Sequence, residues 1–369
     1  MLKRKRFLVA AVAVLAVLSS ALLTAPGFAD GGANHRVRNQ NFGVSGGNVK
    51  DISRRFCCSG TLGALLTAAN GNQYILSNNH VLGLADQATA GDDVSQPGLI
   101  DNNCNVATVV ADFTTAVPLS QNVDAAIAQL RPGTMNSNGA IEDVGVPSSA
   151  TVSPSVGMAV VKSGRTTGFT SGTISSINTS VSIRYPKECG ANGGTARTFT
   201  GQVVISSSTF SAGGDSGSLI LTNNSSHNPV ALLFAGSSTT TIGNPINEVI
   251  SKLSQRLGRT LSFVGSGGAT AATTFNTSSA LQPYTPGRSQ VELPEQAVLH
   301  ASEVLEQHRD RLMNTPLVLG VGVGRSDEND TDAAIVIYVD KATGARPFLP
   351  KSLDGVKVRV ELTDEFVAF

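Results

Sequence analysis

The sequence has no tryptophan and only four cysteines, and it carries little charge: charged residues make up 15% and aromatic residues 5% of its 369 residues. The 27 basic and 27 acidic side chains balance, so the chain lacks the basic surface that nucleic-acid binding requires. A hydrophobic content of 41% excludes a wholly disordered chain. Apart from one apolar run at the start, long hydrophobic stretches are missing, which excludes a protein with many membrane-spanning helices.

That single run is typical of an export signal. The basic residues Lys3–Arg6 precede the apolar stretch Phe7–Ala25, and Gly27-Phe28-Ala29 places small residues where a signal peptidase cuts. We therefore expect residues 1–29 to be a signal peptide and the protein to be secreted, into the extracellular space or the cell envelope. An uncleaved N-terminal anchor is the alternative, and we expect no membrane contact beyond this segment.

Charge density divides the rest of the chain. Residues 30–264 have few charges and many Ser, Thr, Gly and Asn, whereas residues 291–369 are richer in charge and mostly acidic. The stretch 265–290 between them has one charged residue and no apolar periodicity, a composition typical of a flexible linker. The sequence therefore predicts a large domain, a linker and a small C-terminal domain.

The larger domain has the pattern of an all-β fold. Short apolar runs alternate with turn residues, as in sandwiches and barrels. One helix is expected near its end, over Asn247–Leu257, where apolar residues recur at helical spacing. The expected strands are Gly60–Leu66, Tyr74–Ser77, Ala107–Phe113, Asp124–Leu130, Met158–Lys162, Gly172–Ile177, Gln202–Ser206, Ser218–Leu221 and Val230–Phe234.

The C-terminal domain has a different pattern. A helix is predicted from Pro294 to about Met313, because proline suits the first helical turn and an apolar stripe follows. Strands are predicted at Leu317–Gly324, Ala333–Val339 and Val356–Leu362. This order indicates a small α+β module. It could regulate the larger domain from beside its cleft or bind a surface, and we favour regulation.

The segment Gly213–Ser218 carries the sharpest chemical signal. A serine hydroxyl acts as a nucleophile only when it is held rigidly beside a base and faces donors for an oxyanion. The glycines around Ser216 allow a tight turn that presents its Oγ and aims the amides of Gly214 and Ser216 at one point. The alternative is an ordinary turn rich in glycine and serine.

Two further segments supply the partners of a nucleophilic serine. His80 follows an apolar run in a polar turn, where a general base could face a cleft. Asp124 opens a small apolar run and is expected to be half-buried, which suits a carboxylate that orients an imidazole. Each signal alone also fits a structural residue, but the order His80, Asp124, Ser216 joins the three into one catalytic hypothesis.

These residues resemble the chymotrypsin-fold serine endopeptidases. The stretch from Val161 to Gly168, with Ser171-Gly172-Thr173-Ile174 after it, is similar to secreted bacterial enzymes of the streptogrisin and α-lytic type. The segments around His80 and Asp124 also resemble Deg/HtrA and plant narrow-leaf proteases. The resemblance implies two six-stranded β-barrels, with His80 as general base, Asp124 as its orienting residue and Ser216 as nucleophile of peptide hydrolysis through an acyl-enzyme.

The resemblance also implies supporting roles. Gly214 and Ser216 would supply the oxyanion-hole amides, and Asp215 would turn inward to meet a cation. Lys162 stands where streptogrisin-like enzymes have an arginine, so we expect a Lys162–Asp215 ion pair, with Arg165 as the alternative cation.

The resemblance also implies where the substrate's P1 residue, whose carbonyl is attacked, would bind. Phe210 stands at its floor, and Gly236 and Ser237 form its wall. No acid stands at the floor, which disfavours Lys or Arg at P1. We expect Phe210 to fill part of the pocket and to leave room for small or medium apolar side chains.

The cysteines have a more limited interpretation. An exported chain permits disulfides, and four cysteines allow three pairings. Adjacent residues on a strand point to opposite faces, so a bridge between Cys57 and Cys58 would be strained. We expect one of them to pair with Cys104 and the other with Cys189. Zinc is not expected, because the sequence has no Cys-x-x-Cys motif, and neither a metal nor a cofactor is called for.

Two functions remain open at this stage. The first is an exported serine endopeptidase acting on protein or peptide substrates. The second is a latent or inactive protease fold that acts as a binding or regulatory module.

Overall fold

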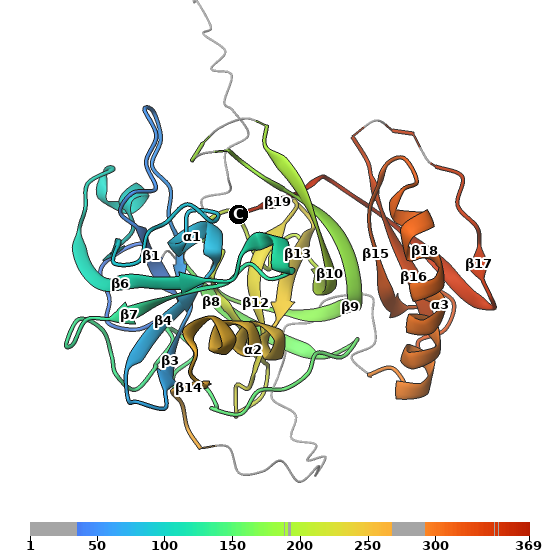
Figure 1. The fold of residues 1–369 in the computed structure, drawn as a ribbon. Helices are drawn as coiled ribbons and strands as arrows, with labels where there is room; N and C mark the ends of the chain where they lie inside the picture. Colours follow the sequence, from blue (N-terminus) through green and yellow to red (C-terminus); the bar gives the residue numbers. More distant parts are fainter. Residues whose placement is uncertain (1–34, 188, 191–192, 268–291, 343, 346) are drawn as a thin grey trace, which may run out of the picture.

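The computed structural model describes residues 35–187, 189–190, 193–267, 292–342, 344–345 and 347–369. The expected signal peptide lies outside these residues, and so does nearly all of the expected linker. Within the described part, no helix combines the length and apolar character needed to cross a bilayer. The fold is mostly β, with two curled sheets, few helices and a further C-terminal domain, as the sequence predicts (Figure 1).

The first sheet holds eight of the described strands, in the order β14-β3-β4-β7-β6-β5-β1-β2. All its pairings are antiparallel, and its inner face is aliphatic: Leu65, Ile75 and Ile127 are at most 1% exposed. The strands are β1 Val44–Asn48, β2 Gly60–Leu62, β3 Ala64–Ala68, β4 Gln73–Ser77, β5 Asp93–Gln96, β6 Thr108–Ala116, β7 Ala126–Leu130 and β14 Leu261–Phe263.

The second sheet closes into a ring of strands. Its strands follow the order β10-β13-β12-β11-β8-β9, and β10 also pairs with β9. This last pairing joins the first strand of the order to the last and closes the six strands into a barrel. Phe210 and Leu233 belong to the apolar cluster on its inside. The strands are β8 Ala159–Gly164, β9 Gly168–Tyr185, β10 Thr195–Ser206, β11 Leu219–Thr222, β12 Pro229–Gly236 and β13 Thr240–Pro245.

The C-terminal strands continue this second sheet beyond β9. Strand β15 pairs with the outer part of β9, with Gly320 opposite Val181 and Gly324 opposite Ser176. Burial of Tyr338, whose hydroxyl hydrogen-bonds Ser176 at 2.8 Å, joins the two parts in one apolar cluster. The strands are β15 Val318–Arg325, β16 Ala333–Asp340, β17 Ser352–Leu353, β18 Val356–Thr363 and β19 Phe366–Ala368.

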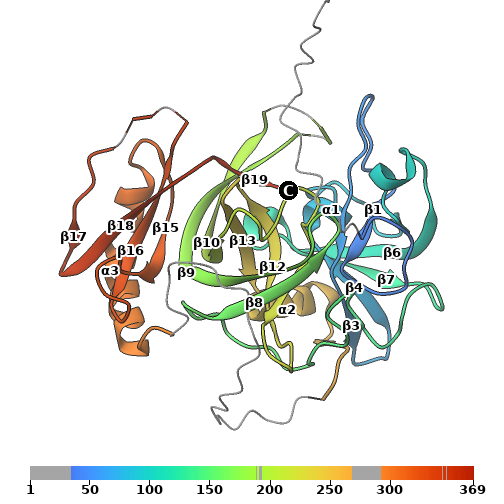
Figure 2. The same ribbon diagram turned by 180° about the vertical axis from the view of Figure 1, so that it is seen from behind.

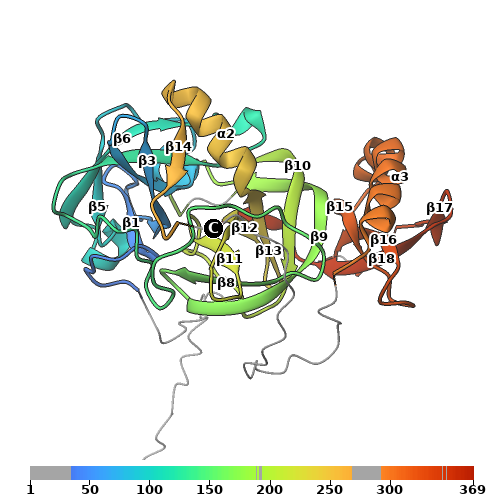
Figure 3. The same ribbon diagram turned by 90° about the horizontal axis from the view of Figure 1, so that it is seen from below.

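Helices cover the sheets at three places. The single turn α1 (Asn79–Leu82) follows β4, α2 (Ile246–Leu257) packs Val249 and Leu253 into the core of the first sheet, and α3 (Glu295–Met313) lies on the C-terminal strands (Figure 3). Short 3-10 turns occupy Leu99–Asn102 and Leu119–Gln121. The sequence located α2 and α3 well because apolar spacing marks them. It missed β13 because the buried residues of this strand are mostly Thr, Gly and Asn, and it missed the full length of β9 because one face of that strand is polar.

The chain returns to the centre of the molecule at its end. After β18 it leaves the C-terminal strands and runs to β19, which lies against β12 and β9. Figures 1 and 2, which view the molecule from opposite sides, both place the last residue between the two sheets, close to α1. The last residues of the chain therefore lie beside α1, which carries His80.

Candidate active site

His80 and Asp124 form a hydrogen-bonded pair. His80 lies on α1 directly after β4, and its Nδ1 is 2.6 Å from Asp124 Oδ2. The backbone N–H of His80 also donates to Asp124 Oδ1 at 3.1 Å. A carboxylate on Nδ1 keeps the proton on that nitrogen and directs Nε2 toward the opposite side of the ring. The pair therefore has the geometry of a base with its orienting acid.

Asp124 is fully buried and is held by groups that the sequence analysis missed. The Tyr185 hydroxyl donates to Asp124 Oδ2 at 2.8 Å, and the Asn78 side chain donates to its carbonyl at 2.7 Å. The N–H of Asp124 donates to Asn244 Oδ1 at 3.0 Å. No local pattern marks Tyr185 or Asn244, because only the closing of the barrel brings them to the aspartate.

The electrostatics of this pair favour a charged imidazole. Burial by itself lowers the pKa of His80, but the charge of Asp124 and its hydrogen bond outweigh that effect, so the pKa of His80 is raised. A hydrogen bond to the Phe369 carbonyl and the charge of Asp51 act in the same direction. Burial raises the pKa of Asp51 to about 6, against the opposing effect of His80.

Ser216 lies in a tight turn between the two sheets. Gly214 and Gly217 have φ values of +96° and +93°, a region that side-chain-bearing residues rarely adopt. At Gly217 a Cβ would also lie 2.3 Å from the Thr61 carbonyl oxygen. The Ser216 carbonyl accepts the N–H of Thr61 at 2.8 Å, which ties the turn to the first sheet.

The hydroxyl and the amides of this turn have different partners. The Ser216 Oγ donates to the Phe234 carbonyl at 3.1 Å, and among the described residues no hydrogen bond joins it to His80. The N–H groups of Gly214 and Ser216 have no acceptor within the described part of the chain. Two unpaired amides beside a serine hydroxyl are the arrangement that stabilises a developing oxyanion.

Asp215 is buried and faces Lys162. The Lys162 Nζ lies 3.4 Å from Asp215 Oδ2, and both side chains are 0% exposed. The N–H groups of Thr166 and Thr167 donate to Asp215 Oδ1 at 2.8 and 3.2 Å. Burial lowers the pKa of Lys162, while Asp215 opposes the shift. The alternative cation, Arg165, instead makes two 2.6 Å hydrogen bonds to Asp101.

The residues expected to line the P1 pocket lie around the end of the chain. Phe210 is fully buried, and Phe369 packs against the apolar cluster that contains it. A Cβ on Gly236 would lie 2.5 Å from the Cζ of Phe369, so the phenyl ring lies directly against this glycine. The Ser237 hydroxyl bonds that of Thr363 at 2.7 Å. The sequence analysis did not identify Phe369, because nothing local connects it to the serine.

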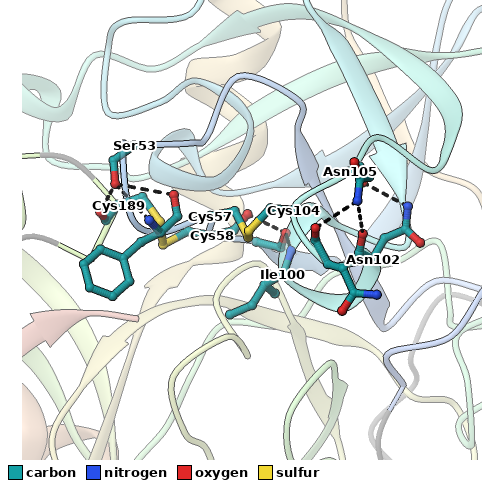
Figure 4. Close-up of a disulfide and its surroundings, with 11 residues drawn as sticks. Ser53, Cys57, Cys58, Ile100, Asn102, Cys104, Asn105 and Cys189 are labelled. Atoms are coloured by element: carbon teal, nitrogen blue, oxygen red, sulfur yellow. Dashed lines mark hydrogen bonds between the residues drawn. A yellow bond between two sulfur atoms is a disulfide. The ribbon is translucent and has the colours of Figure 1, made fainter.

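The two disulfides lie side by side and join Cys57 to Cys104 and Cys58 to Cys189 (Figure 4). This is one of the pairings expected from the sequence. The Cys58–Cys189 bridge connects the first sheet to the turn between β9 and β10. Asp51 lies beside these two sulfurs, but because both are disulfide-bonded they are not thiolate ligands for a metal.

One protein family and several solved structures are similar to parts of this chain. The family model described as the Nal1 C-terminal domain matches residues 92–244. No sequence among curated proteins matches the chain. Among solved structures, a serine protease specific for glutamic acid is 20% identical with a TM-score of 0.42, over 60% of this chain and 98% of the other.

Two further solved structures are also similar to this chain. A chymotrypsin from Cellulomonas bogoriensis is 20% identical with a TM-score of 0.37, over 62% of this chain and 99% of its own. A protease from Nocardiopsis is 20% identical with a TM-score of 0.38, over 55% of this chain and 92% of its own. All three of these solved structures are proteases.

Proposed function

We propose that the protein is an exported serine endopeptidase that hydrolyses peptide bonds through an acyl-enzyme on Ser216. The observation that carries the proposal is the 2.6 Å hydrogen bond between His80 Nδ1 and the buried Asp124. The N–H of Phe369 and the Ser216 hydroxyl share one acceptor, the Phe234 carbonyl, and the Phe369 carbonyl reaches His80. A single residue therefore spans the space between the base and the nucleophile.

In this mechanism Ser216 Oγ attacks the peptide carbonyl carbon while His80 Nε2 takes the hydroxyl proton. The amides of Gly214 and Ser216 stabilise the negative oxygen of the tetrahedral intermediate. His80 then donates the proton to the leaving nitrogen, the carbon–nitrogen bond breaks and the acyl-enzyme remains. Water attacks the ester by the same route in reverse, which releases the carboxylic acid and regenerates Ser216.

Asp215 and Lys162 support this chemistry from below the turn. Their ion pair holds the residue between the two oxyanion-hole amides, so both N–H groups keep one orientation. A preorganised donor pair is effective because it does not have to reorient during the reaction. Lys162 and Asp215 are therefore positioning residues in this mechanism and do not contact the substrate.

Export rests on the residues 1–29 and is in keeping with the two disulfides, which persist in oxidising compartments. The substrates we propose are proteins or peptides, because the main chain of β12 pairs with an extended segment beside Ser216. The competing function, a latent protease fold that binds or regulates, is favoured by the absence of a His80–Ser216 hydrogen bond between these two described residues.

Covalent labelling with a fluorophosphonate probe separates the two. We expect the probe to modify the purified protein at Ser216, identified by mass spectrometry of the labelled peptide. The variants Ser216→Ala and His80→Ala should not react, while Ser208→Ala, which changes an exposed serine, should react like the parent. Folded protein that never reacts, either whole or without residues 367–369, would establish the latent module instead.

A further inference from the structure

The last strand of the chain lies in the cleft as an added strand. β19 pairs antiparallel with β12, with Ala368 opposite Ala235 and Val367 opposite Gly236. One residue further on, the N–H of Phe369 donates to the Phe234 carbonyl at 3.3 Å. Peptides that bind by strand addition use this main-chain pairing for affinity and side-chain pockets for selectivity. The segment from Val367 to Phe369 thus follows β12, the strand whose Phe234 carbonyl also accepts the Ser216 hydroxyl.

Phe369 brings a carbonyl and an aromatic ring to the reacting groups. Its carbonyl oxygen accepts a hydrogen bond from His80 Nε2 at 2.9 Å. Its ring lies against Gly236 and packs on the apolar cluster that includes Phe210. The N–H on β12 and the ring against Gly236 are placed as those of a substrate's P1 residue would be. The carbonyl oxygen differs, because it meets the base and not the amides of Gly214 and Ser216.

We propose that residues 367–369 occupy the cleft along the path of a substrate's main chain, so that they inhibit the enzyme in cis and show that the site takes peptides with an aromatic residue at P1. The proposal rests on the proposed function, because inhibition presupposes an activity. It also enlarges the pocket expected from the sequence, since a phenyl ring fits where Phe210 was expected to leave room for small or medium side chains only.

The inhibited state follows from the hydrogen bonds of His80. Both ring nitrogens face oxygen acceptors: Nδ1 faces Asp124 and Nε2 faces the Phe369 carbonyl. Each contact needs a proton on the nitrogen, so the ring holds a proton on the very atom that must accept one from Ser216. The Ser216 hydroxyl meanwhile donates to Phe234. Base and nucleophile are thus both engaged elsewhere while the segment is bound.

The segment is anchored on the side away from the cleft. Phe366 is fully buried and belongs to the cluster that contains Tyr338 and Phe199. Just before it, Glu365 accepts a hydrogen bond from Arg184 at 2.8 Å, and Asp364 pairs with Lys341 at 3.1 Å. A tethered peptide acts at a local concentration in the millimolar range, so even a weakly binding segment keeps the cleft filled.

These anchors decide which variant tests the proposal. Removing Phe366 would leave a cavity, and removing residues 292–369 would expose the paired edge of β9, so both changes endanger the fold. Deleting only residues 367–369 empties the cleft and keeps the anchors. Phe369→Ala is the point variant, and Phe348→Ala is its control, because the Phe348 side chain is 99% exposed and lies outside the cleft.

The first arm measures the rate of fluorophosphonate labelling at Ser216. Both the deletion of 367–369 and Phe369→Ala should label faster than the whole chain, the deletion by about 10²-fold, whereas Phe348→Ala should match the parent. Equal rates in all forms would overturn the inhibition. If no form labels at all, the proposed function fails, and the second arm alone decides how the cleft binds peptides.

The second arm needs no catalysis. In the deleted protein carrying Ser216→Ala, calorimetric titration compares the peptides acetyl-Val-Ala-Phe, acetyl-Val-Ala-Lys and acetyl-Val-Ala-Asp. The phenylalanine peptide should bind at least about 10-fold more tightly than the charged ones, since burial of an aromatic side chain in an apolar pocket is favourable and burial of a charge there is penalised. Equal affinities would overturn the aromatic P1 pocket, and the undeleted Ser216→Ala chain should bind all three poorly.

Discussion

The imidazole of His80 and the backbone of Phe369 meet although 289 residues separate them in the chain: Nε2 lies 2.9 Å from the Phe369 carbonyl oxygen. The same imidazole holds Asp124 through Nδ1 at 2.6 Å. The histidine therefore links the acid that orients it to the segment that fills the cleft. A change at Asp124 or at Phe369 therefore alters the protonation of His80 Nε2.

Replacing Asp124 by asparagine should remove activity without unfolding the protein. The amide can no longer hold the proton on Nδ1 as a carboxylate does, so the ring loses the tautomer it needs, and kcat should fall by about 10⁴-fold. The measurement is hydrolysis of an aromatic-P1 peptide substrate by the form lacking residues 367–369. Asp112→Asn, which alters a half-exposed carboxylate paired with Arg131, is the control and should leave kcat unchanged. A fall of less than tenfold in Asp124→Asn would contradict the role of Asp124.

Activity should depend on pH through His80. Its pKa is raised, because the charge and hydrogen bond of Asp124 outweigh burial. A protonated imidazole is no base, so kcat/KM should fall as the pH drops through a value above the ordinary one of about 6.5. The groups that act on the ring are Asp124, Asp51 and the Phe369 carbonyl, all of which favour the charged form.

Deleting residues 367–369 removes the Phe369 carbonyl, one of the groups that raise the pKa of His80. The pKa of His80, followed by NMR of the imidazole proton, should then be lower than in the whole chain while remaining coupled to Asp124. A value that does not move on deletion would mean that the Phe369 carbonyl leaves the titration of His80 unaffected. Phe348→Ala again provides the matched control.

Lys162→Met should destabilise the protein strongly. It leaves Asp215 charged, fully buried and without its cation, and breaking such a pair costs about 3–5 kcal/mol of unfolding free energy. Urea denaturation measures the loss, and the labelling rate should fall with it because the turn that carries Ser216 loses its support. Lys252→Met, which breaks a partly exposed pair with Glu248, should cost less than about 1 kcal/mol. The double variant Lys162→Met/Asp215→Asn should recover part of the loss; no recovery would contradict the pairing.

The two disulfides should differ in their contributions. Replacing either pair by serine is expected to cost about 2–5 kcal/mol, and the loss should be larger for Cys58–Cys189, which spans 131 residues, than for Cys57–Cys104, which spans 47. The reason is that the longer loop restricts the unfolded chain more. Thermal unfolding of Cys58→Ser/Cys189→Ser and Cys57→Ser/Cys104→Ser under non-reducing conditions compares them. The reverse order would mean that native-state contacts, and not loop length, dominate.

Local sequence patterns determined many of the strands, the two longer helices and the turn that carries Ser216. The alternation of short apolar runs with turns predicted the strands around His80 and Ser216, because a strand end with a polar turn is marked by its own residues. Helices α2 and α3 were predicted by apolar spacing, since their buried faces repeat every three to four residues. The glycines beside Ser216 likewise carried the backbone geometry of the turn in their residue type.

Only the tertiary structure decided which distant groups meet. Tyr185 reaches Asp124 because β9 continues far beyond its apolar stretch, and its outer half is polar on one face. Likewise, Phe369 reaches His80 because β15 pairs with β9 and sends the chain back across β12. Residue type and spacing act over a few positions, whereas strand pairing joins any two segments whose hydrogen bonds and buried faces match. For that reason the sequence indicated the candidate catalytic groups, and the fold alone determined that strand β19 lies among them.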